Sequence, residues 1–144
     1  MRRAGGSAIV TLAVGLSACA ALAPAPTPPM PRGTTGVLEI REGLASYYGR
    51  EFHGRITASG ARFNMNALVA AHPSYPFGTL VRVTNLANGR STRVRIVDRG
   101  PAPRRRAEGI VIDVSRRAAE ELGFIQQGQA RVRLDVLRWG NRRS

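Results

Sequence analysis

Apolar and polar side chains alternate with a period of two along much of the chain, which is the pattern of strands that bury one face. Three segments show this alternation, at residues 79–85, 92–97 and 130–136. Residues 110–114 are apolar at nearly every position, which predicts a central strand. Residues 43–48 predict an opening strand. Because the strands are short and polar on one face, we expect them to close into a small β-barrel.

Turn and cap residues mark two of the connections. Asn88 and Gly89 lie between two alternating segments and predict a hairpin with a type I′ turn, because both central positions of that turn need a positive φ. Ser115 is a suitable N-cap, residues 116–122 predict a short helix, and Gly123 predicts its end. The folded unit is therefore expected to be all-β with one or two short helices.

The first 18 residues are expected to be an export signal. Arg2 and Arg3 precede an apolar stretch at residues 8–16, which is shorter than the roughly 20 residues of a membrane-spanning helix. The sequence LSAC at residues 16–19 resembles the bacterial lipobox, so Cys19 is the predicted lipid anchor. The alternative is a plain signal peptide with an incidental cysteine.

Composition divides the remainder of the chain. Residues 19–35 join the cysteine to a proline-rich run that predicts an extended tether, residues 36–139 form the expected barrel domain, and residues 140–144 form a basic tail. We expect a monomer in the cell envelope, attached to the membrane through the lipid, at the periplasmic face of the outer membrane.

The chain holds 22 basic and 9 acidic residues, for a formal charge of +13. An exported chain meets no nucleic acid, so the charge either faces carboxylates and phosphates of the envelope or keeps the barrel soluble. A single Cys forms no intrachain disulfide, and with two His it predicts no metal site; no cofactor is expected. The arginines considered for a polyanionic partner are Arg90, Arg93, Arg95, Arg104, Arg105 and Arg106.

Two acids stand out from their neighbours. Asp98 ends an apolar strand and enters the turn Arg99, Gly100 and Pro101, where it is either a functional carboxylate at a strand mouth or a cap for backbone amides. Asp113 lies within the apolar strand and must be paired, because an unpaired buried charge costs several kcal/mol. It is either functional or a structural acceptor for loop amides or an arginine.

The two histidines allow ordinary structural interpretations as well. His72 follows an apolar turn at residues 68–71 and is either a packed side chain or a functional one. His53 lies in a loop beside Gly54. Aromatic residues cluster in the same half of the chain and suit either sugar faces or a core: Tyr47, Tyr48, Phe52, Tyr75 and Phe77.

An ordered series of motifs resembles the rare lipoprotein A (RlpA) family and spans about residues 43–137. The motifs are GLASYYG (43–49), FHGRITASG (52–60), LVAAH (68–72), FGT (77–79), VTNL (83–86), NGR (88–90), VDRGP (97–101) and IDVS (112–115). The resemblance implies a six-stranded double-psi β-barrel like that of expansins. It also implies an endolytic lytic transglycosylase that cleaves the β-1,4 bond between MurNAc and GlcNAc in peptidoglycan strands, leaves 1,6-anhydromuramyl ends and prefers naked glycan.

The resemblance also assigns roles by position. Asp98 matches the family's catalytic Asp, His72 its active-site His, and Asp113 an Asp that lines the expansin-like groove. We expect Asp98 to carry the proton, His72 to orient it or stabilise charge, and Asp113 to support both electrostatically. The expected substrate-binding residues are Tyr48, His53, Arg55, Thr57 and Arg99.

One part of the family pattern differs in this sequence. Where the family commonly has Glu and Asp after the TASG motif, this chain has Ala61 and Asn64. Two functions therefore stay open: an active lytic transglycosylase, and an expansin-like peptidoglycan-binding lipoprotein that does not cleave.

Overall fold

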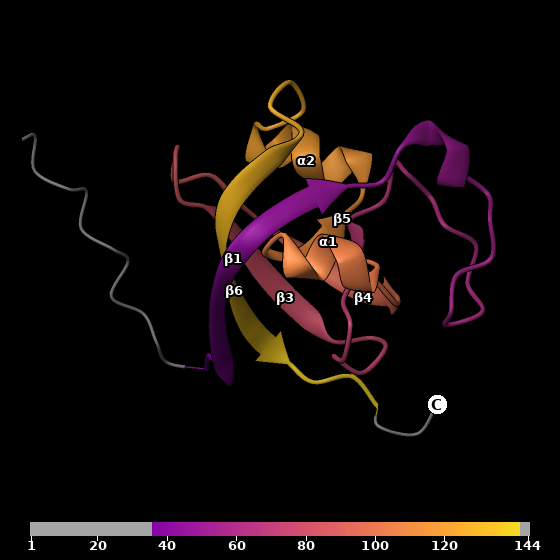
Figure 1. Cartoon of the computed structure of the whole chain (residues 1–144). Coiled ribbons are helices and arrows are strands. Elements are labelled where there is room, and N and C mark those ends of the chain that lie inside the picture. Colours follow the sequence, from indigo (N-terminus) through magenta and orange to yellow (C-terminus); the bar gives the residue numbers. More distant parts are fainter. Residues whose placement is uncertain (1–35, 142–144) are drawn as a thin grey trace, which may run out of the picture. The chain divides into compact units, whose positions relative to one another are not determined.

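A computed structural model describes residues 36–141, which form a closed six-stranded barrel (Figure 1). The strands are β1 (Glu39–Tyr47), β2 (Val69–Ala71), β3 (Leu80–Asn85), β4 (Ser91–Asp98), β5 (Ile110–Val114) and β6 (Gln129–Arg138). The helices are α1 (Pro103–Ala107), α2 (Arg116–Leu122) and a 3-10 turn at Arg50–Phe52. None of the helices within residues 36–141 is long and apolar enough to cross a membrane.

Several predictions fall outside the described residues. They are the export signal at 1–18, the tether at 19–35 with Cys19, and the last three positions, 142–144, of the predicted tail.

The barrel mixes parallel and antiparallel pairing in the order β1-β5-β2-β4-β3-β6. β1 runs parallel to β5 and β2 runs parallel to β4, while the other neighbours are antiparallel. In this register Ala71 lies opposite both Asp98 and Asp113, and Asp113 lies opposite Ser46. Four adjacent strands thus bring residues that are distant in sequence into one row.

The core fills the barrel because alternate residues of each strand point inward. Val81, Val83, Val94 and Ile96 from β3 and β4 are completely buried, and α2 closes one end with Leu122. Burying each side chain of this size stabilises the fold by about 1.5–3 kcal/mol. The polar residues between them face outward, as the period of two predicted.

The predicted helix is confirmed in full. It runs from Arg116 to Leu122, the Ser115 hydroxyl accepts a hydrogen bond from the Ala118 N–H, and Gly123 ends it with φ of 75°. The hairpin between β3 and β4 is also confirmed, but its turn type was predicted wrongly. Residues 86–90 connect the strands, and the Gly89 N–H donates to the Asn85 carbonyl four residues earlier, so the loop is longer than a two-residue turn. The Asn88 side-chain amide donates to the Leu122 carbonyl and ties this loop to α2.

The segment before His72 was also predicted wrongly. Residues 68–71 contain strand β2 rather than an apolar turn. This strand is only three residues long, so its sequence shows no period of its own. Its pairing with β4 on one side and β5 on the other holds it in the sheet.

Candidate functional site

Asp98 lies at the last position of β4, where the strand opens into a loop. Its Oδ1 accepts hydrogen bonds from the N–H of Ala58 at 2.9 Å and of Arg99 at 2.8 Å. The Tyr48 hydroxyl donates to its Oδ2 at 3.1 Å. Both interpretations of this residue are therefore visible in one side chain: Oδ1 caps the loop, and Oδ2 faces the phenol.

Asp113 lies on β5 and is only 5% exposed. Its Oδ1 accepts hydrogen bonds from the Ser46 hydroxyl and, at 3.4 Å, from the Arg105 guanidinium of α1. Arg105 also donates to the Ser46 hydroxyl at 2.7 Å. The other carboxylate oxygen of Asp113, Oδ2, has no hydrogen-bond partner in the described part of the chain. Because no buried polar side-chain atom there lacks a partner, Oδ2 reaches solvent.

Gly100 leaves the space between these groups open. A Cβ added to Gly100 would lie 3.6 Å from Asp113 Oδ2 and 3.7 Å from the Tyr48 hydroxyl oxygen. Its φ is +150°, which side chains rarely adopt. The free oxygen of Asp113 and the phenol bound to Asp98 therefore face the same small space.

Tyr48 links the acids to an aromatic cluster. Burial raises the pKa of its phenol far above the ordinary value, and the nearby Asp98 carboxylate raises it further. The phenol therefore stays protonated and remains a hydrogen-bond donor. Its ring packs 4.7 Å from that of Phe63 and 5.2 Å from that of Phe52, measured between centroids.

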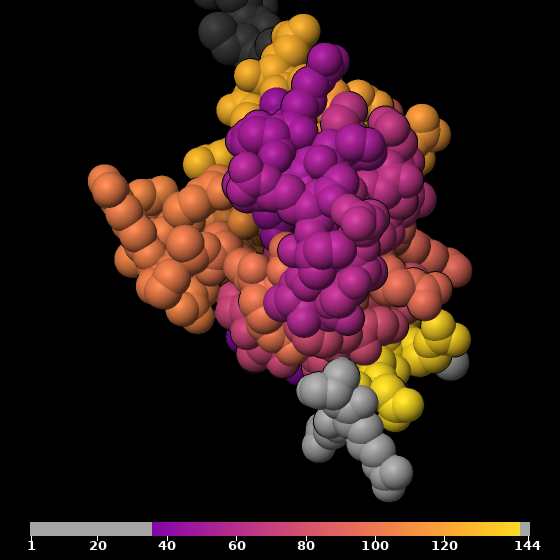
Figure 2. All heavy atoms as spheres, turned by 90° about the vertical axis from the view of Figure 1, so that its right-hand side faces the viewer, coloured from indigo at the N-terminus to yellow at the C-terminus, as the bar shows by residue number. Residues whose placement is uncertain are grey.

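The loop between β1 and β2 covers this side of the molecule. Figure 2 shows it as the indigo to magenta surface, with the segment around α1 projecting beside it in orange. This loop supplies the Ala58 N–H to Asp98, and α1 supplies Arg105 to Asp113. Two connections that carry no barrel strand thus complete the surroundings of the two acids.

His72 makes its side-chain contacts away from the acids. The backbone N–H of His72 donates to the backbone carbonyl of Asp98 at 3.2 Å, but the His72 ring stacks on the Tyr75 ring at 3.5 Å between centroids. Its Nδ1 accepts hydrogen bonds from the N–H groups of Ser74 and Tyr75. Burial lowers the pKa of His72 to about 4, so the ring is neutral at pH 7. No hydrogen bond joins it to either carboxylate within residues 36–141.

The other expected substrate-binding residues are spread over the loops. Tyr48 contacts Asp98, as described above. Thr57 is buried, and its hydroxyl donates to the Ala61 carbonyl at 2.8 Å. His53 accepts a hydrogen bond from the Met65 N–H, and Arg55 lies over the Phe52 ring. Arg99 turns toward the His72 side, where it donates to the Tyr75 carbonyl at 2.8 Å and lies over the Phe77 ring.

Two contributors were missed by sequence reasoning. Ser46 contacts Asp113 only because β1 pairs with β5 in a parallel register, which the sequence does not display. Arg105 was interpreted only as part of a charged surface. The Pro103 at the start of α1 signalled a helix there, and that helix directs Arg105 toward β5.

The comparisons with known proteins identify the family. A family model described as "Lytic transglycolase" matches residues 40–134. The chain belongs to this family. Within it, the chain is 52% identical over 101 residues to the probable endolytic peptidoglycan transglycosylase RlpA of Synechocystis, covering 70% of this chain and 30% of that relative. It is 50% identical over 95 residues to the endolytic peptidoglycan transglycosylase RlpA of Neisseria meningitidis, covering 66% and 38%. The chain therefore spans about a third of the length of these curated relatives.

Solved structures confirm the expected fold. The barrel matches Streptomyces papain inhibitor with a TM-score of 0.55 and 21% identity, covering 71% of this chain and 97% of that one. It matches an expansin of Clavibacter michiganensis with a TM-score of 0.54 and 20% identity, covering 72% and 52%. The double-psi β-barrel predicted from the motif series is thus the fold of this lytic transglycolase domain.

Proposed function

We propose that this domain is a peptidoglycan lytic transglycosylase that cleaves the MurNAc-GlcNAc β-1,4 bond. The observation that supports it is the Tyr48 hydroxyl, which donates to Asp98 Oδ2 and lies with the free Oδ2 of Asp113 beside the space left by Gly100. Glycosidic cleavage needs a proton donor beside the bond and negative charge beside the carbon that becomes electron-poor. Asp98 and Asp113, which the Tyr48 hydroxyl connects, are the two carboxyl groups that can supply both.

The proposed reaction uses one carboxyl group twice. Protonated Asp98 gives its proton to the glycosidic oxygen, and the bond from that oxygen to C1 of MurNAc breaks. The C6 hydroxyl of the same MurNAc then forms a bond to C1 and loses its proton to the Asp98 carboxylate. The products are a 1,6-anhydromuramyl end and a free 4-hydroxyl on GlcNAc. Water is not consumed, and the acid returns to its starting state.

Asp113 and Tyr48 have supporting roles in this proposal. The free Oδ2 of Asp113 stabilises positive charge on the sugar, while Ser46 and Arg105 hold Oδ1 in place. The Tyr48 hydroxyl holds Asp98 Oδ2 in place through its hydrogen bond of 3.1 Å. The expected preference for naked glycan follows if stem peptides are too bulky for the space beside Gly100.

The test is product formation by an acid-to-amide variant. Asp98→Asn keeps size and the loop hydrogen bonds but removes the titratable proton, so anhydromuramyl products from naked glycan should disappear in mass spectra. Glu42→Gln is the matched control, because Glu42 is exposed on the outer surface of β1. If Asp98→Asn retains wild-type product formation, the proposal is wrong.

A second candidate function is favoured by Ala61. It lies in the loop that supplies the Ala58 N–H to Asp98, at the position where the family commonly has Glu. Without that carboxylate the barrel could bind wall glycan without cleaving it. The Ala61→Glu variant distinguishes the cleaving function from the binding function. If neither wild type nor Ala61→Glu forms anhydromuramyl products while both still bind sacculi, the binding function is established. A gain of about tenfold equals only about 1.4 kcal/mol of transition-state stabilisation.

We also propose that Cys19 is lipidated and holds the domain at the periplasmic face of the outer membrane. The support is the LSAC sequence and the proline-rich run that follows it. Acyl chains supply about 0.8 kcal/mol of binding free energy per buried CH₂. Cells fed radiolabelled palmitate should label the wild type and not Cys19→Ser, and membrane fractionation should place only the wild type in outer-membrane vesicles. An unlabelled wild type would refute the anchor.

A further inference from the structure

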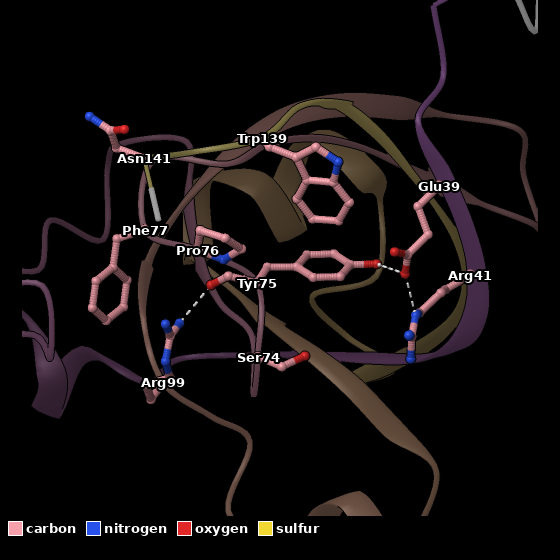
Figure 3. A pocket seen from close by; sticks show the side chains of 9 residues that line it. All are labelled: Glu39, Arg41, Ser74, Tyr75, Pro76, Phe77, Arg99, Trp139 and Asn141. Atoms are coloured by element: carbon pink, nitrogen blue, oxygen red, sulfur yellow. Dashed lines mark hydrogen bonds and ion pairs between the residues drawn. The ribbon is translucent and has the colours of Figure 1, made fainter. Parts of the chain in front are cut away.

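A cavity of about 520 Å³ lies beside the loop that follows Asp98, yet neither acid lines it. Figure 3 shows its walls, which come from the start of β1, the connection between β2 and β3, and the residues after β6. Its volume falls within the range of small-molecule sites, about 300–1,000 Å³. The wall residues used below are Glu39, Arg41, Tyr75, Phe77, Arg99 and Trp139.

Three aromatic rings form its apolar surface. The Trp139 ring meets Tyr75 edge-on, with centroids 5.2 Å apart and planes at 83°. Tyr75 is held from behind by the stacked His72 ring. Phe77 is held by the Arg99 guanidinium, which lies 3.9 Å from the ring centroid. Figure 3 shows the Trp139 and Tyr75 rings side by side in the cavity. The rings are therefore fixed in place before any ligand arrives.

A charged pair forms its polar surface. Glu39 Oε1 accepts hydrogen bonds from the Tyr75 hydroxyl at 2.9 Å and from the Arg41 Nε. The hydrogen bond from Arg41 holds the pKa of Glu39 below its ordinary value, so the carboxylate is ionised at pH 7. Its Oε2 has no partner in the described part of the chain. An acceptor and a donor thus lie next to each other at the edge of the aromatic wall.

We propose that this cavity binds a pyranose ring of an N-acetylated glycan, as a saccharide subsite separate from the two acids. The inference rests on the proposed function for the choice of glycan. A pyranose presents C–H bonds on its face and hydroxyls at its rim. The C–H face suits the partly exposed ring of Trp139, which the buried Tyr75 holds in place, and neighbouring hydroxyls suit a carboxylate beside a guanidinium. Glu39 accepts from one hydroxyl and Arg41 donates to the next.

The position of the cavity gives this subsite a use. Arg99 contributes to its wall and is the residue directly after Asp98. The backbone of His72, whose ring supports Tyr75, is hydrogen-bonded to Asp98. A glycan strand held in the cavity would therefore be bound next to the loop that begins at Asp98, the proposed acid. The subsite would raise the affinity for long glycan without touching the bond that breaks.

The cavity contains its own reporter. Trp139 is the single tryptophan of the chain, so fluorescence excited where tyrosine does not absorb reports on this site alone. The probe is the N-acetylglucosamine tetramer, titrated at pH 7 into wild type, Glu39→Gln and Glu42→Gln. We expect a saturable change in emission for wild type and Glu42→Gln with equal affinity, because Glu42 is exposed and lines neither site. Glu39→Gln should bind about tenfold more weakly, because a hydrogen bond to a charged group is lost.

Two outcomes overturn the inference. One is no saturable response of the wild type to the tetramer. The other is a response that Glu39→Gln leaves unchanged. The D-alanyl-D-alanine dipeptide serves as a second probe, and a response to it in place of the tetramer would make the cavity a peptide site and refute the saccharide assignment. The product assay tests the proposed function independently of the cavity. It compares product formation by wild type with that by Asp98→Asn, and this variant changes no residue that lines the cavity.

Discussion

Asp113 and Asp135 are two buried carboxylates with similar exposure, 5% and 4%, and both contact arginine. Their oxygens are used differently. Asp135 Oδ2 accepts two hydrogen bonds from Arg82, and its Oδ1 accepts one from Arg133 at 2.7 Å. Asp113 receives all its hydrogen bonds on Oδ1, while Oδ2 faces the space beside Gly100.

The difference separates a structural carboxylate from a candidate functional one. Burial of a charge requires partners, and Asp135 satisfies that requirement with both of its oxygens. Asp113 satisfies it with one oxygen, which leaves the second oxygen free for a ligand. Burial and an arginine partner alone would not distinguish the two residues. The unpaired oxygen, placed beside Tyr48 and Gly100, does.

Of these two buried carboxylates, Asp113 should show the larger effect, and on activity. Asp113→Asn should lower anhydromuramyl product formation by about a hundredfold, because removing one group that stabilises developing charge costs about 2.7 kcal/mol or more in the transition state. Its unfolding midpoint in urea should change little, since the amide can still bond Ser46. Initial rates and urea curves on one preparation test both. Near wild-type rates would place Asp113 with Asp135 as a structural residue.

Asp135→Asn should show the reverse pattern. It leaves Arg82 and Arg133 without their carboxylate partner, and both arginine side chains are partly exposed, at 33% and 22%. We expect the free energy of unfolding to fall by about 2 kcal/mol, below the 3–5 kcal/mol of a fully buried pair. The rate on naked glycan, measured well below the unfolding temperature, should stay within twofold of wild type. A large rate loss with unchanged stability would contradict the comparison.

The sequence predicted the strands that carry these carboxylates but not the hydrogen bonds that distinguish Asp113 from Asp135. The period of two identified β3, β4 and β6, and the apolar run identified β5, because those patterns are local. Asp98 could be singled out because it ends a strand before a glycine turn. The free oxygen of Asp113 could not, since it depends on Ser46 and Arg105, and the register that joins them is set by tertiary pairing.

For His72 the sequence predicted the position of the residue but not the direction of its ring. The motif predicted it beside Asp98, and its backbone does meet Asp98. The direction of its ring depends on the loop of residues 72–77, whose N–H groups bind Nδ1. The aromatic cavity likewise joins β1, the β2-β3 connection and the residues after β6. No sequence period relates Glu39 to Trp139, so only the closed barrel reveals their neighbourhood.

A smaller effect is expected from filling the space beside Gly100. Gly100→Ala places a methyl group between Asp113 Oδ2 and the Tyr48 hydroxyl at ordinary contact distance, so activity should fall about tenfold, or about 1.4 kcal/mol. The backbone strain should cost about 1 kcal/mol of stability. Gly89→Ala is the control, because Gly89 also has a positive φ, of +75°, with nothing within 4 Å of the added Cβ. Equal activity losses in both variants would show strain alone.

The smallest expected effect concerns His72, another buried titratable side chain. Burial lowers its pKa from 6.5 to about 4, so the folded state binds its proton less readily than the unfolded chain. The contribution of the neutral His72 ring to the free energy of unfolding is therefore fully present above pH 6.5 and is lost as the pH falls toward 4.

His72→Asn keeps an acceptor for the Ser74 and Tyr75 N–H groups but does not titrate. Between pH 7 and pH 5 the wild type should lose about 1–2 kcal/mol of unfolding free energy that His72→Asn retains, given 1.36 kcal/mol per pKa unit. Urea unfolding at four pH values measures the difference. Glu39, whose pKa is held below 4.5, titrates below this range and stays ionised in both proteins. Parallel pH profiles for the two proteins would mean that the His72 ring titrates normally, and the buried, cavity-supporting position of His72 would then be wrong.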